Sequence, residues 1–353
     1  MNREALFRLA RTEGVGPALH RRLLARHGSP EAAVDALGTR AFPRDAARRE
    51  MEALARRGAH LLFLGHPPYP PLLALTEDAP LLLAAEGDLA ALEGAAVALV
   101  GARNASALGR RFAEDLADAL AVRGVVVVSG LARGIDAAAH EGALRSGRTI
   151  AVIAGGLDRP YPPENSALQA RIAAEGGLVL SEAPLGTAPF ARHFPRRNRI
   201  VAGLSLGVVV VEAGLQSGTL ITARLAAEAG RELFAVPGHP LDPRARGGND
   251  LIKRGAHLVE TAEDVLEHLP AAPAPAPLLR LSALPEPPET IQETPAAPGL
   301  AAQVLESMAG APISVDELGR RCQLSRSQLA AALLELELEG RIQTLPGNRV
   351  APL

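Results

Sequence analysis

Seven short apolar runs, separated by helical patterns, constrain the fold of this chain more than any other feature of its sequence. The runs are Val97–Val100, Val125–Val128, Ile150–Ala154, Leu178–Leu180, Val208–Val211, Leu233–Val236 and His257–Val259. Apolar runs without polar alternation are typical of strands that are buried on both faces. Amphipathic segments such as Arg110–Arg123 and Thr222–Ala229 lie between them and favour helical crossovers. The sequence therefore predicts an α/β fold, in which helices cover both faces of an open, doubly wound, mostly parallel sheet.

Other segments precede and follow this predicted sheet domain, which we place at residues 65–269. Residues 1–64 are rich in Ala and Arg and predict a helical domain. In it, Gly14-Val15-Gly16-Pro17 precedes a helical stretch and resembles the hairpin of a helix-hairpin-helix module, whose exposed amides can hold a DNA phosphate. A packed helical cap on the sheet domain is the alternative, and we favour it slightly.

The carboxyl-terminal part of the chain has two different compositions. Residues 270–298 are rich in Pro and Ala, which predicts an extended linker because little apolar area is available for burial. Residues 299–353 predict a winged helix-turn-helix domain. Its expected elements are a helix over Ser314–Cys322 with an N-cap serine, a turn over Gln323–Ser325, a helix over Arg326–Glu339 and a hairpin over Arg341–Val350.

Composition excludes several classes of protein. The formal net charge is only −2, so any basic surface must be local. Cys322 is the only cysteine, which excludes an intramolecular disulfide framework and a cysteine-cluster metal site. The chain contains no apolar run long enough to span a membrane, and Met-Asn-Arg-Glu-Ala does not begin a signal peptide. We therefore expect a soluble, cytoplasmic protein without a membrane partner.

An arginine-rich run at residues 192–199 indicates a bound anion. The run reads Arg-His-Phe-Pro-Arg-Arg-Asn-Arg and contains no acidic residue. Crowded guanidinium groups repel one another, and a polyanion relieves that repulsion. Arginine also presents a planar fork that pairs with phosphate through two hydrogen bonds.

Glycine-rich turns follow several of the predicted strands. They include Gly101–Arg103, Ser129–Asp136 and Ser217–Thr222, the last two of which open helices. Ligands of open parallel sheets bind at the carboxyl ends of the strands, where free helix amides attract anions. One such turn is explained by ordinary turn and cap chemistry. Several turns beside the arginine run favour an anion site, with Arg103 and Arg133 adding charge.

We tested the sequence for catalytic and metal-binding patterns. Five carboxylates lie near strand ends, and we expect them to cap helices or pair with arginine: Asp136, Asp158, Glu164, Glu182 and Glu212. Residues 203–207 match the hydrolase G-x-S-x-G pattern, but a helical segment precedes the serine and a strand follows it, which is the wrong order. The chain has no G-x-x-x-x-G-K-[ST] loop or zinc-binding pattern. His140, His193 and His239 are scattered. We expect no catalytic residue, metal or cofactor.

Together, these motifs resemble the DNA-processing protein A family, abbreviated DprA and also called Smf. The resemblance covers residues 97–259. It rests on Gly101–Arg103, Ser129–Asp136, Gly155–Asn165, Ser181–Gly186, Phe194–Ser205, Ser217–Ala223 and Ala235–Gly238. The helical front and the winged-helix tail also resemble accessory domains of that family. One departure is Ala102, where the family usually has a hydroxyl side chain.

The resemblance implies an extended Rossmann-like domain that binds single-stranded DNA without a mononucleotide cofactor. It implies a non-enzymatic homodimer that protects incoming DNA during natural transformation and loads the RecA recombinase onto it. The DNA-binding residues expected from the motifs and the resemblance are Gly101, Arg103, Ser129, Gly130, Arg133, Gly134, Phe194, Arg196, Arg197, Arg199, Ser217 and Gly218. Phe194 is there as a base-stacking platform, and Tyr161 is a second aromatic near a strand end. Gap filling by both rings is an equal alternative.

Two other functions remain open at this point. The first is a nucleotide-processing phosphoribohydrolase of related fold, whose P-G-G-x-G-T-x-x-E motif carries a glutamate. Here the glutamate position is Thr222 and the leading Pro-Gly-Gly is absent. The second is a duplex-binding regulator acting through the tail, but Glu335, Glu337 and Glu339 disfavour contact with phosphates.

Overall fold

The computed structural model describes residues 2–270, 300–308, 313–322, 341–345 and 349–352, with single positions between 324 and 336. The chain divides into two compact units, Met1–Leu279 and Arg280–Leu353, and each is considered by itself. Among the described residues, no helix is both long and apolar enough to cross a membrane.

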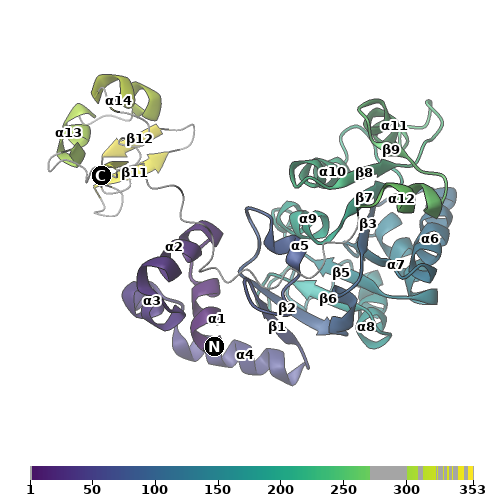
Figure 1. Cartoon of the computed structure of the whole chain (residues 1–353), viewed down its shortest axis with the longest axis horizontal. Coiled ribbons are helices and arrows are strands. Elements are labelled where there is room, and N and C mark those ends of the chain that lie inside the picture. Colours follow the sequence, from purple (N-terminus) through teal and green to yellow (C-terminus); the bar gives the residue numbers. More distant parts are fainter. Residues whose placement is uncertain are drawn as a thin grey trace. The chain divides into compact units, whose positions relative to one another are not determined.

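The described part of the first unit contains a nine-stranded sheet in the order β1-β2-β6-β5-β4-β3-β7-β8-β9 (Figure 1). Strands β3 to β9 pair in parallel, as the apolar runs predict. The strands are β1 (His60–Phe63), β2 (Leu82–Gly87), β3 (Ala96–Val100), β4 (Val126–Ser129), β5 (Thr149–Ile153), β6 (Leu178–Ser181), β7 (Gly207–Val210), β8 (Glu232–Ala235) and β9 (His257–Leu258).

Strands β1 and β2 are additions that the sequence did not predict. They pair with each other and, through β2, with β6 in antiparallel fashion. β1 begins at His60, inside the range expected to be helical. Its exposed first residue and its short length hide it from a search for apolar runs.

Helices cover both faces of the sheet. The helices are α1 (Arg3–Arg11), α2 (Pro17–His27), α3 (Pro30–Leu37), α4 (Arg44–Arg56), α5 (Pro71–Ala74), α6 (Ala107–Val122), α7 (Ile135–Ser146), α8 (Ser166–Ala174), α9 (His193–Leu204), α10 (Thr219–Glu228), α11 (Arg246–Lys253) and α12 (Ala262–His268). Of these, α2 and α3 pack with α1 in an amino-terminal cluster. Helix α6 illustrates the local rules: the Ser106 hydroxyl accepts a hydrogen bond from the Gly109 amide, and Gly124 ends the turn with a positive φ of 77°.

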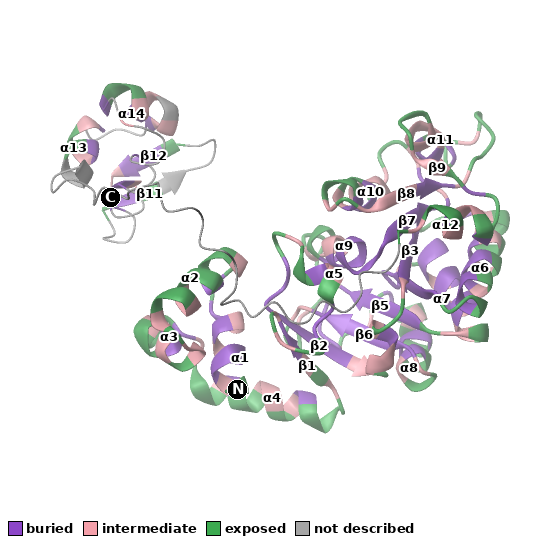
Figure 2. Ribbon diagram, viewed as in Figure 1, coloured by how far each residue is buried: buried purple, intermediate pink, exposed green. Residues whose placement is uncertain are grey.

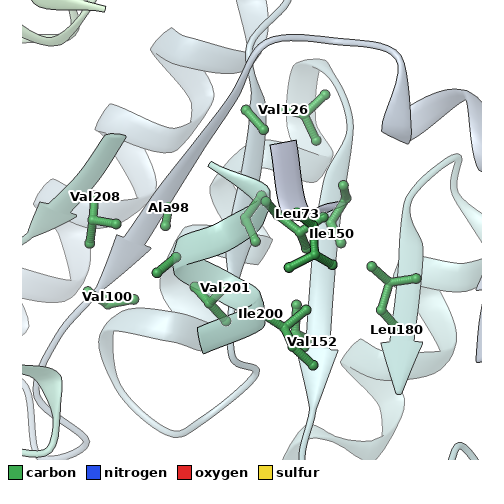
Figure 3. Close-up of a cluster of buried hydrophobic side chains, with 14 of the residues drawn as sticks. Leu73, Ala98, Val100, Val126, Ile150, Val152, Leu180, Ile200, Val201 and Val208 are labelled. Atoms are coloured by element: carbon green, nitrogen blue, oxygen red, sulfur yellow. The ribbon is translucent and has the colours of Figure 1, made fainter. Parts of the chain in front are cut away.

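The core consists of two apolar layers that sandwich the sheet. On one face, side chains of α6, α7 and α12 pack against Val97, Leu99 and Val127. On the other face, Ile200 and Val201 of α9 pack against Val152 and neighbouring strand residues (Figure 3). The central strands are accordingly buried along their length, as Figure 2 shows. Since α9 is anchored by its apolar carboxyl-terminal half, its polar amino-terminal half lies at the strand ends.

The amino-terminal helices pack on the sheet domain. Leu6 and Phe7 of α1 and Leu54 of α4 share a buried cluster with Ile153 and Leu168. The helical front is thus packed on the sheet domain, and a phosphate-holding role of its hairpin stays a prediction. At the hairpin, Gly14 has a positive φ of 78° and Gly16 is the N-cap of α2.

The second unit contains helices α13 (Leu300–Ser307) and α14 (Val315–Cys322) and a sheet in the order β10-β12-β11. Its strands are β10 (Ile313–Ser314), β11 (Ile342–Leu345) and β12 (Arg349–Pro352). The hydroxyl of Ser314 accepts from the Glu317 amide, so the predicted N-cap is confirmed. The linker predicted at 270–298 lies outside the described residues except for its first position, and so do most of the turn and the helix predicted at 323–339 and the tip of the hairpin.

Candidate nucleic-acid-binding site

A pocket of about 620 Å³ opens at the carboxyl ends of the central strands. Strand β3 lies between β4 and β7, so the chain leaves β3 to one side of the sheet and later returns to the other. Ligands of open α/β sheets bind at such a switch point. Seven of the predicted site residues line the pocket: Gly101, Arg103, Gly130, Phe194, Arg197, Ser217 and Gly218.

Arg197 forms the floor of the pocket and is only 6% exposed. Its Nη1 donates a hydrogen bond to the carbonyl of Val152 at 3.0 Å, while its buried Nε has no partner among the described residues. Burial lowers the pKa of Arg197 to about 10, and the charge of Asp136 opposes that shift. The guanidinium therefore remains charged at neutral pH, in a place where it is short of hydrogen-bond acceptors.

Asp136 is buried beside Arg197 at the first turn of α7. Its Oδ2 accepts from the amides of Gly130 at 3.1 Å and Ala132 at 3.3 Å. Burial raises the pKa of Asp136, whereas Arg197 and the two amides favour the ionised form. With its carboxylate committed to these amides, Asp136 shapes the turn between β4 and α7.

Aromatic rings and a second arginine occupy one wall of the pocket. The guanidinium carbon of Arg103 lies 4.9 Å from the centre of the Phe194 ring. Tyr161 packs edge-on against the same ring, with 5.6 Å between the centres. Phe194 is therefore held between a cation and an aromatic edge and still lines the pocket.

The turn before α10 also lines the pocket. Gly218 is the N-cap of α10, the first turn holds no acidic group, and the Thr219 amide donates to the Ser217 hydroxyl at 3.2 Å. The Thr219 hydroxyl donates to the carbonyl of Gly101 at 3.0 Å, which fixes this turn against the end of β3. The partial positive charge of the helix end, with no acidic side chain in the first turn, favours an anion here.

Three predicted arginines lie outside the pocket lining. Arg199 is 13% exposed and binds Glu182 through Nη2 at 2.6 Å, with a further ion pair to Asp78. Arg196 is 70% exposed and lies 3.9 Å from Glu182. Arg133 pairs with Glu164 at the surface. Arg199 thus holds α9 in place, and Arg196 and Arg133 face solvent.

Ser129 and Gly134 also lie outside the lining. Ser129 is fully buried, and its hydroxyl donates to the carbonyl of Leu99 at 2.6 Å. Gly134 has a positive φ of 75°, and a Cβ atom there would lie 2.3 Å from the carbonyl of Ala102. Both residues therefore shape the turn that contains Gly130, through contacts with neighbouring backbone and not with the pocket.

The remaining carboxylates near the strand ends serve the backbone or pair with arginine, as expected. Glu212 accepts from the amide and the hydroxyl of Ser106, and Asp158 accepts from the Gly186 amide. Ser205 of the G-x-S-x-G match is buried and donates to Val201. Within the described part of the chain, no cluster of three or more His, Cys, Asp or Glu is arranged to hold a metal ion.

Sequence reasoning treated the arginine run as a stretch of charge, so it selected Phe194 and Arg197 but missed Asn198 and Val201. Phe194, Arg197, Asn198 and Val201 all line the pocket, and they recur at helical spacing on one face of α9. Assigning a helix to residues 193–204 in advance would have selected this set and left Arg196 and Arg199 off that face. In the same way, assigning helix α10 in advance would have selected Thr219 and Thr222, which also line the pocket.

Comparison with known proteins identifies the family. The pattern of the family described as DNA recombination-mediator protein A matches residues 60–270. Patterns for a DprA-like N-terminal HHH domain and a DprA winged helix domain match residues 1–53 and 285–348. Protein Smf of Escherichia coli is 41% identical over 313 residues, which are 88% of this chain and 82% of that protein.

Two solved structures are similar in sequence and in fold. DNA processing protein A of Streptococcus pneumoniae superimposes with a TM-score of 0.67 at 35% identity, covering 76% of this chain and 99% of that one. The Helicobacter pylori protein, solved to describe its single-stranded DNA binding mode, has a TM-score of 0.53 at 32% identity and covers 59% of this chain and 94% of that one. The chain therefore belongs to the DNA recombination-mediator protein A family, together with the proteins named DprA and Smf.

Proposed function

We propose that the pocket between β3, β4, β7 and α9 binds single-stranded DNA. The observation that carries this proposal is that Arg103, the Phe194 ring and the amino-terminal end of α10 line the same pocket. Single-strand binding requires cations and helix amides for phosphates and an aromatic face for a base. The relative from Helicobacter pylori, which is described as binding single-stranded DNA, supports the same ligand.

Each part of the pocket has a task in this proposal. The Gly218 amide and the positive end of α10 receive a phosphate, and Arg103 of the same pocket neutralises its charge. Phe194 provides the stacking surface for a base. Arg197 remains below, where it supports Gly130 and adds positive potential, because its guanidinium is already bound to Val152. Backbone amides and stacking are tolerant of sequence, so binding without strong base preference is expected.

The cellular role is a finer proposal. We expect the protein to protect incoming single strands during natural transformation, to act as a homodimer and to load the RecA recombinase onto the bound DNA. The family's description as a recombination mediator and the DNA-processing names of the relatives support this role. Loading can be measured as RecA-dependent strand exchange on DNA that is already covered by a single-strand-binding protein.

A salt titration of single-strand binding tests the proposed ligand. Each phosphate contact contributes about −0.7 to the slope of log affinity against log salt concentration on single strands. Arg103→Ala should weaken binding and reduce the magnitude of that slope by about 0.7. Arg111→Ala, which removes an exposed arginine of α6, is the matched control. A wild-type slope near zero, or equal affinity for single strand and duplex with no effect of Arg103→Ala, contradicts the proposal.

The enzymatic alternative, a phosphoribohydrolase, is disfavoured by the residue at position 222. Thr222 lines the pocket and is buried, so a side chain there would meet a bound nucleotide. A threonine hydroxyl cannot replace the carboxylate that such an enzyme uses in N-glycoside cleavage. We therefore expect binding without catalysis. Release of free base from a nucleoside monophosphate by the purified protein would restore the alternative.

A further inference from the structure

Phe190 is an exposed aromatic residue at the rim of the pocket. The chain has nine aromatic residues, and only Tyr161 and Phe190 are exposed, at 43% and 55%. Tyr161 lines the pocket, and so do Pro189 and Ala191 on either side of Phe190. Exposing a phenylalanine to water is unfavourable. A chain with so few aromatics thus places both exposed rings at one site.

The surroundings of Phe190 repeat those of Phe194. The guanidinium carbon of Arg192 lies over the Phe190 ring at 5.3 Å, and the His193 ring packs edge-on with 5.7 Å between centres. At Phe194 the corresponding partners are Arg103 and Tyr161. The sequence analysis did not include Phe190 or Arg192 among its site residues.

The two clusters are joined by one tight turn at the start of α9. The His193 amide donates to the carbonyl of Phe190 at 2.9 Å, and the Phe194 amide donates to Ala191 at 3.3 Å. From Thr187 to Arg199 the chain has no acidic residue. A strand leaving the pocket past Phe194 therefore meets a second ring with a cation beside it and no negative side chain from this segment.

We infer that Phe190 and Arg192 form a second nucleotide subsite, in which Phe190 stacks a further base of the same single strand and Arg192 pairs with its phosphate. This inference rests on the proposed function of the pocket. Because Phe190 lies at the rim, the subsite lengthens the DNA footprint. Short strands occupy the pocket alone, and longer strands reach Phe190.

The experiment is a length series of oligothymidylates of up to about 16 nucleotides, measured with Phe190→Ala and Phe190→Leu. On long strands, Phe190→Ala should bind about fivefold to about a hundredfold more weakly than wild type, and Phe190→Leu should recover little because it lacks a flat ring. On the shortest strands that bind, both variants should equal wild type. Leu241→Ala, which removes an exposed apolar side chain from another loop, is the control.

Arg192→Gln adds an independent readout. It should reduce the magnitude of the salt slope by about 0.7 on long strands only, whereas Phe190→Ala should leave the slope unchanged. Equal affinity of wild type and Phe190→Ala at every length overturns the inference, and so does an equal loss at every length. A change in oligomeric state of Phe190→Ala without a change in binding also overturns it, because the ring then contacts a second copy of the chain.

The two proposals fail in different ways. If wild-type protein shows no salt-dependent single-strand binding, the function of the pocket is wrong. If wild type and Arg103→Ala behave as expected while the Phe190 and Arg192 variants bind like wild type, the proposed function of the pocket is supported and only the second subsite is wrong.

Discussion

The guanidinium of Arg197 lies directly against the backbone of Gly130. A Cβ atom at residue 130 would lie 1.4 Å from Nη1 of Arg197, a distance that no structure tolerates. The φ of Gly130 is not positive, so glycine is needed here for space and not for backbone conformation. A buried arginine of α9 thereby explains a glycine 67 positions earlier in the chain, in the turn after β4.

This contact predicts the effect of Gly130→Ala. The added methyl group must displace Arg197, which then loses its hydrogen bond to Val152 and its position near Asp136. Disturbing a buried charge in this way should lower the free energy of unfolding by about 3 kcal/mol or more and weaken DNA binding as well. Thermal denaturation and strand binding measure the two effects. Wild-type stability in Gly130→Ala would contradict the described position of Arg197.

Gly218→Ala should separate stability from binding. A Cβ atom at Gly218 would meet nothing within 4 Å, and its φ is not positive, so the free energy of unfolding should change by less than about 0.5 kcal/mol. Because Gly218 lines the pocket at the start of α10, the methyl group should obstruct a phosphate and weaken single-strand binding. Unchanged binding would mean that no ligand approaches this helix end closely.

The ion pair between Glu182 and Arg199 should stabilise the fold. Glu182 also accepts at its carbonyl from Arg11 of α1, 2.9 Å away, so it joins the helical domain to α9. Glu182→Gln should lower the free energy of unfolding by about 1.5–3 kcal/mol, which is typical of hydrogen bonds to charged groups. Glu164→Gln, which breaks the more exposed pair with Arg133, should cost less than about 1 kcal/mol. If Glu182→Gln and Glu164→Gln lowered the free energy of unfolding equally in chemical denaturation, the stabilising role of the Glu182–Arg199 pair would be contradicted.

His140 should make the protein sensitive to acid. The Thr149 hydroxyl donates to Val127, so His140 Nδ1 donates to Thr149, and the buried Nε2 has no partner among the described residues. Burial lowers the pKa of His140 from its ordinary 6.5 to about 3. As pH falls, His140 therefore takes up its proton at a higher pH in the unfolded chain than in the folded chain. The free energy of unfolding decreases as pH falls from 6.5 towards 3.

The loss through His140 should be about 1.4 kcal/mol for each pH unit within that window. His140→Asn keeps a donor near Thr149 and removes the titrating ring, so the slope of unfolding free energy against pH should decrease between about pH 6 and about pH 5. A residual slope from His20, whose pKa burial lowers to about 4, is expected to remain. An unchanged slope in His140→Asn would show that this histidine is not buried in neutral form.

The sequence by itself predicted the seven parallel strands, the winged-helix outline and an anion site at the strand ends. These features follow from local rules: apolar runs mark buried strands, and glycine turns that open helices expose amides at one edge of a parallel sheet. Strands β1 and β2 escaped prediction because they gain their order from pairing with each other and with β6, not from their own pattern.

Only the tertiary structure decided what each arginine of the run does. Within four residues of α9, Arg196 faces solvent, Arg197 lies beneath the pocket and Arg199 binds Glu182. Residues one or two apart on a helix, such as Arg197 and its neighbours Arg196 and Arg199, point in different directions, and their direction is set by the apolar face that Ile200 and Val201 bury. The partner of Arg197 is Val152 of β5, and the partner of Arg199 is Glu182, which directly follows β6. Charge was thus readable from the sequence, whereas its placement depended on packing between distant segments.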